Sequence, residues 1–169
     1  MKKGIILVSF GTTHVDTEKK TIGRIQELFA SVFDEYYIYS ASTSDIVRKV
    51  LAKRDKRTVM DVETALQRMK QEGIEEVLLQ PTHIIDGIEN QKMKKAAEGY
   101  RDVFSRLAIG EPLLSSATDY VKAAEAVLEE LQPDDETALL FMGHGTEHPA
   151  NAAYAVLQDC FHRDRKSVV

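Results

Sequence analysis

Short apolar runs alternate along this chain with longer segments in which apolar residues recur every three or four positions. The runs have the length of strands: 3–10, 36–41, 76–80 and 107–109. Uniformly apolar strands separated by helices are typical of a parallel sheet, because helices on both faces bury every strand. We therefore predict an α/β fold whose parallel sheet is flanked by helices on both faces. Ligands of such sheets bind beyond the carboxyl ends of the strands.

The segments between the runs predict amphipathic helices. We expect a helix over 21–33 and another that Thr43, Ser44 or Asp45 caps. Asp61 is expected to open a third helix, which Gly73 ends. Two further helices are expected, with these bounds: about 89–105, and from Thr118 or Asp119 to the polar break at 132–135.

A second domain is predicted after that break, because residues 137–142 (TALLFM) start the strand and helix pattern again. The hexapeptide SFGTTH at 9–14 also resembles GHGTEH at 143–148. Three positions match: Gly11 with Gly145, Thr12 with Thr146, and His14 with His148. We interpret residues 1–133 as a first α/β domain and residues 134–169 as the beginning of a duplicated, incomplete second one. The other part of that second domain is expected beyond Val169.

Composition argues against several classes of partner. The net charge is −5 and the pI is about 5.6, so the sequence offers no broad basic field for nucleic acid or for an acidic membrane surface. No apolar stretch approaches the roughly 20 residues of a membrane helix. Cys160 is the only cysteine, which excludes an internal disulfide and fits the reducing cytoplasm. We therefore expect a cytoplasmic protein that binds neither nucleic acid nor membrane.

His144 is the strongest candidate for chemistry, because Gly143 and Gly145 flank it directly after the apolar run at 137–142. Glycines let the backbone turn sharply and leave the imidazole uncovered. A neutral imidazole can bind a divalent transition metal or accept a proton. The alternative is a turn histidine bonded to a nearby backbone carbonyl, and the flanking glycines favour the functional interpretation.

His83 and Glu89 form a second candidate group in QPTHIIDGIEN, which also follows an apolar run. Together with His144 they would suit a divalent ion. Two alternatives remain open, since Glu89 can simply favour the positive end of its helix and His83 can be a satisfied polar group at the core's edge. The remaining histidines are expected to be structural or solvated: His14, His148 and His162. Cys160 is expected to lie in the core and not to act as a nucleophile.

Several separated motifs resemble one family in the same order along the chain. They are VSFGT at 8–12, ASTSDIVRKV at 41–50, HIIDGIE at 83–89, GEPLLSS at 110–116 and FMGHG at 141–145. The chain resembles the anaerobic cobalt chelatases of cobalamin biosynthesis, which are class II chelatases related to ferrochelatase. This resemblance implies ATP-independent insertion of a divalent metal into sirohydrochlorin, a tetrapyrrole. The metal is a substrate, with Co²⁺ first and Ni²⁺ or Fe²⁺ as alternatives, and no organic cofactor is expected.

The resemblance also implies roles for individual residues. His144 matches the family's histidine that binds the metal and accepts a proton, and Glu89 matches its catalytic cleft carboxylate. We expect metallation to fail when acid protonates His144, because an imidazolium cannot ligate a metal. Loop hydroxyls and backbone N–H groups are expected to meet the carboxylates of the substrate. The residues predicted to bind the tetrapyrrole are Ser9, Phe10, Gly11, Thr12, His83, Gly143 and Gly145.

The family pattern places two further metal ligands in the second domain, beyond Val169. Because this leaves apolar surface uncovered, we expect self-association of the chain, for example as a homo-oligomer, unless another segment completes it. One alternative is a module that binds metal or tetrapyrrole without turnover. A small hydrolase or phosphate-binding protein is more distant, since the sequence has neither a nucleophile elbow nor a P-loop motif.

Overall fold

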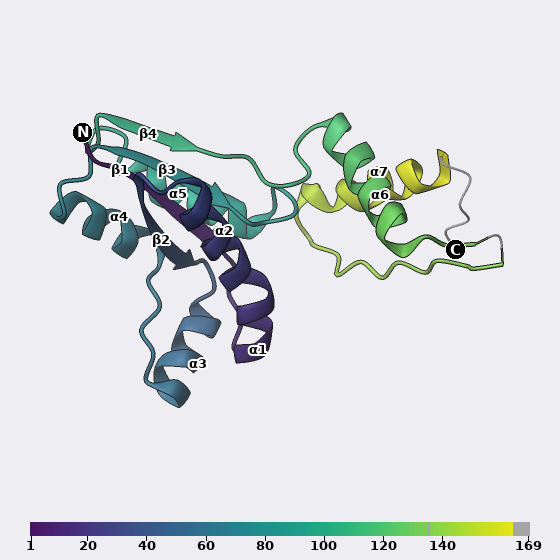
Figure 1. The fold of residues 1–169 in the computed structure, drawn as a ribbon, viewed down its shortest axis with the longest axis horizontal. Coiled ribbons are helices and arrows are strands. Elements are labelled where there is room, and N and C mark those ends of the chain that lie inside the picture. The colour runs from purple at the N-terminus through teal and green to yellow at the C-terminus, as the bar shows by residue number, and fades with distance from the viewer. Residues whose placement is uncertain (135, 164–169) are drawn as a thin grey trace. The chain divides into compact units, whose positions relative to one another are not determined.

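The computed structural model describes residues 1–134 and 136–163. Its four-stranded sheet is parallel, with the strand order β2-β1-β3-β4 (Figure 1). The strands are β1 (Lys3–Ser9), β2 (Tyr36–Ser42), β3 (Glu76–Pro81) and β4 (Arg106–Ile109). All four predicted strands are present, and the α/β fold class is confirmed.

The described helices join these strands and continue beyond β4. Those before β4 are α1 (Val15–Glu18), the π-helical turn η1 (Lys19–Gly23), α2 (Arg24–Val32), α3 (Asp45–Asp55), α4 (Val62–Gln71) and α5 (Ile88–Glu98). Those after it are α6 (Ala117–Leu131), the 3₁₀ turn η2 (Pro149–Asn151) and α7 (Ala152–Arg163). Among the described residues, no helix is both long and apolar enough to cross a membrane.

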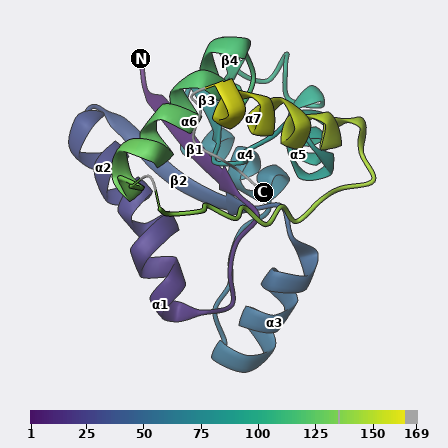
Figure 2. The ribbon, with the colours of Figure 1, turned by 90° about the vertical axis from the view of Figure 1, so that its right-hand side faces the viewer.

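Helices α4 and α5 cover one face of the sheet, and α2 lies over the other (Figures 1 and 2). The main core fills the space between the sheet and the α4 and α5 layer, where Ile6 of β1 and Leu79 of β3 are fully buried. Leu66 and Met69 of α4 and Met93 of α5 are buried against them. Because β1 and β3 pair in parallel as far as Val8 and Pro81, their carboxyl ends lie side by side at the edge of this core.

The face with α2 is less well covered than the sequence suggests. We expected the apolar stripe of residues 21–33 to be buried, yet Leu28 and Val32 are 60% and 62% exposed. The helix also begins earlier than expected, because α1 and η1 lead into α2 from Val15. Apolar periodicity predicted this helix correctly, but it could not tell how much of the stripe another element covers.

Helix starts follow the expected capping chemistry with one difference. The side chain of Ser44 accepts a hydrogen bond from the Val47 N–H, and Asp61 likewise caps α4. At α6 the cap is Ser116, whereas Thr118 or Asp119 was expected. Asp119 instead completes a capping box, since its carboxylate accepts from the Ser116 N–H at 2.7 Å. One helix end also differs from the expectation, since α5 ends at Glu98, seven residues before the expected end at 105.

The chain divides into two compact units. The sheet unit comprises Met1–His83 and Glu89–Glu111, and the second unit comprises Ile84–Ile88 and the chain from Pro112 onward. In the second unit α6 and α7 pack together through Ala124, Leu128 and Phe161. The boundary at 133 and the duplicated second domain stay predictions, because this division does not test them.

The strand expected at 137–142 was wrong. These residues are irregular, with only an isolated bridge at Leu139, and Leu140 and Met142 are 81% and 96% exposed. A strand needs a neighbour to satisfy its backbone N–H and C=O groups. The described part of the second unit contains no sheet that this run could join, so its apolar sequence alone does not make it a strand.

Candidate functional site

The loops after β1 and β2 are joined directly to each other. The Ser42 hydroxyl donates to the Phe10 carbonyl at 2.6 Å, and the Thr43 N–H donates to the Ser9 carbonyl at 2.9 Å. Gly11 has a φ of +95°, and a Cβ there would lie 2.7 Å from the Ser42 Oγ. The structure therefore brings the predicted 9–12 loop against residues 42–44, with Ser9 buried and Phe10 half exposed.

We predict that Gly11→Ala destabilises the sheet unit more than Gly73→Ala. Both glycines have positive φ, so both variants carry roughly 1–2 kcal/mol of backbone strain. A Cβ at Gly11 would also clash with the Ser42 side chain, whereas a Cβ at Gly73 would meet nothing within 4 Å. Overpacking should add about 1 kcal/mol or more for Gly11→Ala, which urea unfolding of the two variants measures. Equal losses of stability would contradict the close contact with Ser42.

His83 follows β3, two residues after Pro81 ends that strand. The Thr82 N–H donates to the Val8 carbonyl at 2.8 Å, so the chain is fixed to the carboxyl end of β1 immediately before His83. Both ring nitrogens of His83 are buried and lack a hydrogen-bond partner among the described residues. Burial lowers the pKa of His83, and the negative charge of Glu89 partly opposes this shift. The ring is therefore neutral at neutral pH.

Glu89 lies in the first turn of α5, and its two carboxylate oxygens have different surroundings. Lys92 Nζ donates to Oε1 at 2.6 Å, one turn further along the helix. Oε2 is buried and has no hydrogen-bond partner in the described structure. The side chain of Glu89 is 24% exposed and that of Lys92 is 54% exposed. The structure thus brings His83 and Glu89 together at one end of the sheet.

His144 belongs to the second unit and is exposed on the turn that Gly143 and Gly145 form. A Cβ at Gly143 would lie 2.7 Å from the ring of Tyr154, so only glycine fits there without a shift. Gly145 has a φ of +73°, which favours glycine for conformational reasons. The prediction that glycines leave this imidazole uncovered agrees with the geometry, although the turn follows an irregular segment instead of a strand.

The two turns that the sequence comparison matched have the same local hydrogen bonding. Gly11 and Gly145 both have positive φ. Thr12 Oγ1 accepts from the N–H two residues later at 3.2 Å, and Thr146 Oγ1 does the same at 3.2 Å. In both cases a histidine stands at the N-cap of the next helical segment: His14 before α1 and His148 before η2. His148 also accepts from the Ala150 N–H, as expected of a cap, whereas His14 makes no such bond.

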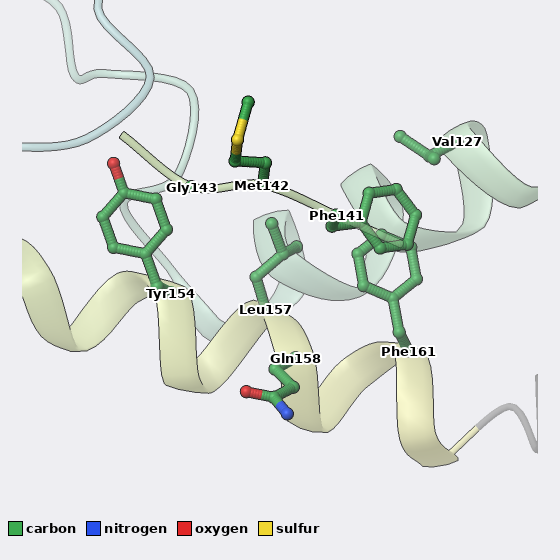
Figure 3. A pocket seen from close by; sticks show the side chains of 8 residues that line it. All are labelled: Val127, Phe141, Met142, Gly143, Tyr154, Leu157, Gln158 and Phe161. Atoms are coloured by element: carbon green, nitrogen blue, oxygen red, sulfur yellow. The ribbon is translucent and has the colours of Figure 1, made fainter. Parts of the chain in front are cut away.

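An apolar cavity of about 440 Å³ lies beside this turn within the second unit (Figure 3). Tyr154, Leu157 and Phe161 project into it from α7, and Phe141 stacks on Phe161 with ring centroids 4.3 Å apart. The rest of its lining is Val127, Met142, Gly143 and Gln158. A cavity with such walls offers contact to an apolar surface and little polar recognition.

A second, more polar pocket of about 250 Å³ lies in the sheet unit where β2 ends. Ser42 and Thr43 line it together with two cations and three carboxylates: Arg48, Lys92, Asp45, Asp61 and Glu63. The Arg48 guanidinium is held by the Ser42 carbonyl at 2.8 Å and by Asp45 at 2.5 Å. Sequence reasoning missed both cations, although the Glu89 and Lys92 spacing of i, i+3 on a helix is a recognisable signal for an ion pair.

The described residues contain no group of three or more His, Cys, Asp or Glu side chains placed to hold a metal ion. His83 and Glu89 lie in the sheet unit and His144 in the second unit, and each unit is described by itself. A site that combines all three therefore stays a prediction. What the structure defines is an α/β protein with polar, glycine-containing loops at the carboxyl ends of parallel strands, which is the class that binds ligands there.

Comparison with known proteins identifies the family. The family model for cobalt chelatase (CbiK) matches residues 3–169, and the chain belongs to that family. It is 37% identical over 161 residues to the sirohydrochlorin cobaltochelatase of Salmonella typhimurium, covering 93% of this chain and 60% of that protein. It is also 37% identical over 162 residues to the sirohydrochlorin cobaltochelatase CbiKC of Nitratidesulfovibrio vulgaris, covering 92% of this chain and 56% of that protein. The resemblance noted from the motifs is confirmed, and the chain spans less than two thirds of either relative.

Proposed function

We propose that this chain takes part in ATP-independent insertion of Co²⁺ into sirohydrochlorin, in the anaerobic route to cobalamin. The observation that carries the proposal is the family match over residues 3–169, together with the two relatives named for this reaction. We place the proposed reaction in the cytoplasm, because a chain with a single cysteine forms no internal disulfide and suits a reducing compartment.

Metallation replaces two pyrrole N–H protons with one divalent cation, so the protein must bind the cation and accept protons. In this proposal His144 first binds the metal. Once the metal has passed to the ring, the freed nitrogen of His144 takes one of the two protons and the other passes to water. Its exposure on a glycine-flanked turn supports this role. Glu89 supplies a carboxylate whose Oε2 has no hydrogen-bond partner in the described structure.

The tetrapyrrole carries carboxylates that need donors. The proposed binding residues 9–12 offer hydroxyls and backbone N–H groups. The cations Arg48 and Lys92 of the adjoining pocket are already paired with carboxylates, so they are not counted among these donors. Gly143 and Gly145 would let the tetrapyrrole approach the backbone beside His144. These contacts need no broadly basic surface, in keeping with the net charge of −5.

A second candidate function is a module that binds metal or tetrapyrrole without turnover. The chain covers 60% and 56% of the two relatives, and the described residues contain no group of three side chains placed to hold a metal. Binding without turnover is therefore tested beside the reaction. A homo-oligomer that joins two copies would supply further ligands, and sedimentation of the chain with and without tetrapyrrole tests this.

An anaerobic absorbance assay separates the two functions. The chain is mixed with sirohydrochlorin and Co²⁺, and the spectral change of the ring is compared with a protein-free control. We expect a rate above the control that rises in proportion to protein concentration. Bound Co²⁺ or tetrapyrrole with a rate equal to the control would support the binding module and contradict catalysis by this chain.

A further inference from the structure

The surroundings of Glu89 are unusually incomplete for a partly buried carboxylate. One oxygen, Oε1, is held by Lys92 at 2.6 Å. The other, Oε2, is buried without a hydrogen-bond partner among the described residues, and so are both ring nitrogens of His83. Buried polar atoms are nearly always paired, so unpaired ones that occur together in a native protein require a physical explanation.

The chemistry of the two side chains is complementary. A carboxylate only accepts hydrogen bonds, whereas a neutral imidazole carries one N–H donor and one acceptor. Burial lowers the pKa of His83, so its ring is neutral at neutral pH, whereas the negative charge of Glu89 acts in the opposite direction. The His83 N–H is thus a suitable donor for the Glu89 Oε2 that lacks one, and such a bond would select one tautomer of His83.

We infer that His83, which the sequence predicted to bind the tetrapyrrole, instead acts with Lys92 as a positioning residue, and that the two hold the Glu89 carboxylate from its two sides. Lys92 fixes Oε1 from the next turn of α5, and His83 donates to Oε2 from the end of β3. The strand places His83 rigidly, because the Thr82 N–H bonds to the Val8 carbonyl at 2.8 Å. We call this arrangement of Lys92, Glu89 and His83 the clamp. It is a feature of the sheet unit, so the inference rests on the proposed function only for the task of Glu89.

The clamp explains why a lysine lies so close to a carboxylate that must attract a cation. Without a fixed orientation the glutamate side chain would populate several rotamers and lose entropy when the substrate binds. Partners that orient such a group from behind typically contribute 10–100-fold to metal affinity or activity. We therefore expect their removal to slow metallation more than it weakens tetrapyrrole binding.

The first test uses nuclear magnetic resonance of the whole chain with ¹⁵N-labelled histidine and needs no activity. We expect one His83 ring nitrogen to be protonated and the other not, and we expect Glu89→Gln to shift the resonance of the protonated one. Lys95→Met, which changes another exposed lysine of α5, should leave the His83 signals in place. If Glu89→Gln leaves the chemical shifts of the His83 ring nitrogens unchanged, the clamp is wrong.

The second test uses metallation kinetics. His83→Phe keeps the ring volume but removes the donor, and we expect kcat to fall 10–100-fold while KM for sirohydrochlorin changes by less than about threefold. His83→Asn should retain most of the rate if Nδ1 is the protonated nitrogen, and His83→Gln should do so if it is Nε2. Lys92→Met should also lower kcat, and Lys92→Arg should lower it less. If His83→Phe has the same kcat as both His83→Asn and His83→Gln, His83 is a packing residue and the inference is wrong.

The two tests distinguish the clamp from the proposed function. A chain that does not insert metal but shows the Glu89-dependent His83 signal has the clamp and lacks the activity. A chain that inserts metal, but whose His83 resonances do not change in Glu89→Gln, has the activity and lacks the clamp.

Discussion

Metallation by the chain should fall at least about a hundredfold in His144→Ala, to the rate without protein. The imidazole is the ligand and base in the proposed reaction, and the described residues provide no three-ligand group to replace it. Because His144 is exposed, its removal should leave the fold intact, with a change in stability within about 0.5 kcal/mol. The anaerobic absorbance assay gives the rate, and circular dichroism with thermal melting checks the fold.

The matched control for this variant is His162→Ala, which removes an exposed histidine of α7. It should retain the wild-type rate. An active His144→Ala variant would remove this histidine from the mechanism and leave Glu89 as the remaining proposed catalytic residue. If the variant is inactive because it is unfolded, its melting temperature will be lowered or its thermal transition will be absent.

Leu66→Ala should cost about 3 kcal/mol of unfolding free energy. Leu66 is fully buried in α4, where it belongs to the core with Ile6, Leu79 and Met93. Truncation removes apolar contact and leaves a cavity that close-packed neighbours cannot fill. Urea unfolding followed by circular dichroism measures the loss, as a lower midpoint.

The control is the same substitution at an exposed site. Leu28→Ala on α2 truncates a leucine that is 60% exposed, and it should cost less than about 1 kcal/mol. Similar losses in the two variants would mean that α2 covers its face of the sheet as tightly as α4 covers the other. The exposure of Leu28 and Val32 argues against that.

The secondary structure of the sheet unit could be predicted because local signals and tertiary packing agree there. Strands β1 to β4 are apolar runs of the expected length, and Ser44 and Asp61 cap helices by chemistry that adjoining residues determine. Both matched Gly-Thr turns also have the positive φ that their glycines suggest. The family was recognisable from the same stretches, and the comparisons confirm it.

The candidate site could be predicted only in part. Spacing indicates that His83 and Glu89 follow β3, and that His144 lies on a glycine-flanked turn. Spacing cannot indicate that both ring nitrogens of His83 are buried, or that only one oxygen of Glu89 has a partner. These properties depend on neighbours that are distant in the chain, so they require coordinates.

The sequence by itself therefore determined the parallel α/β class, the family and the residues able to carry chemistry, since local periodicity and motifs encode them. Only the tertiary structure decided which apolar segments are covered. Residues 137–142 have the composition of a strand but are irregular, because a strand is stable only beside another strand. The tertiary structure also decided that the ring nitrogens of His83 and one oxygen of Glu89 are buried, because burial arises from packing between segments that local sequence does not relate.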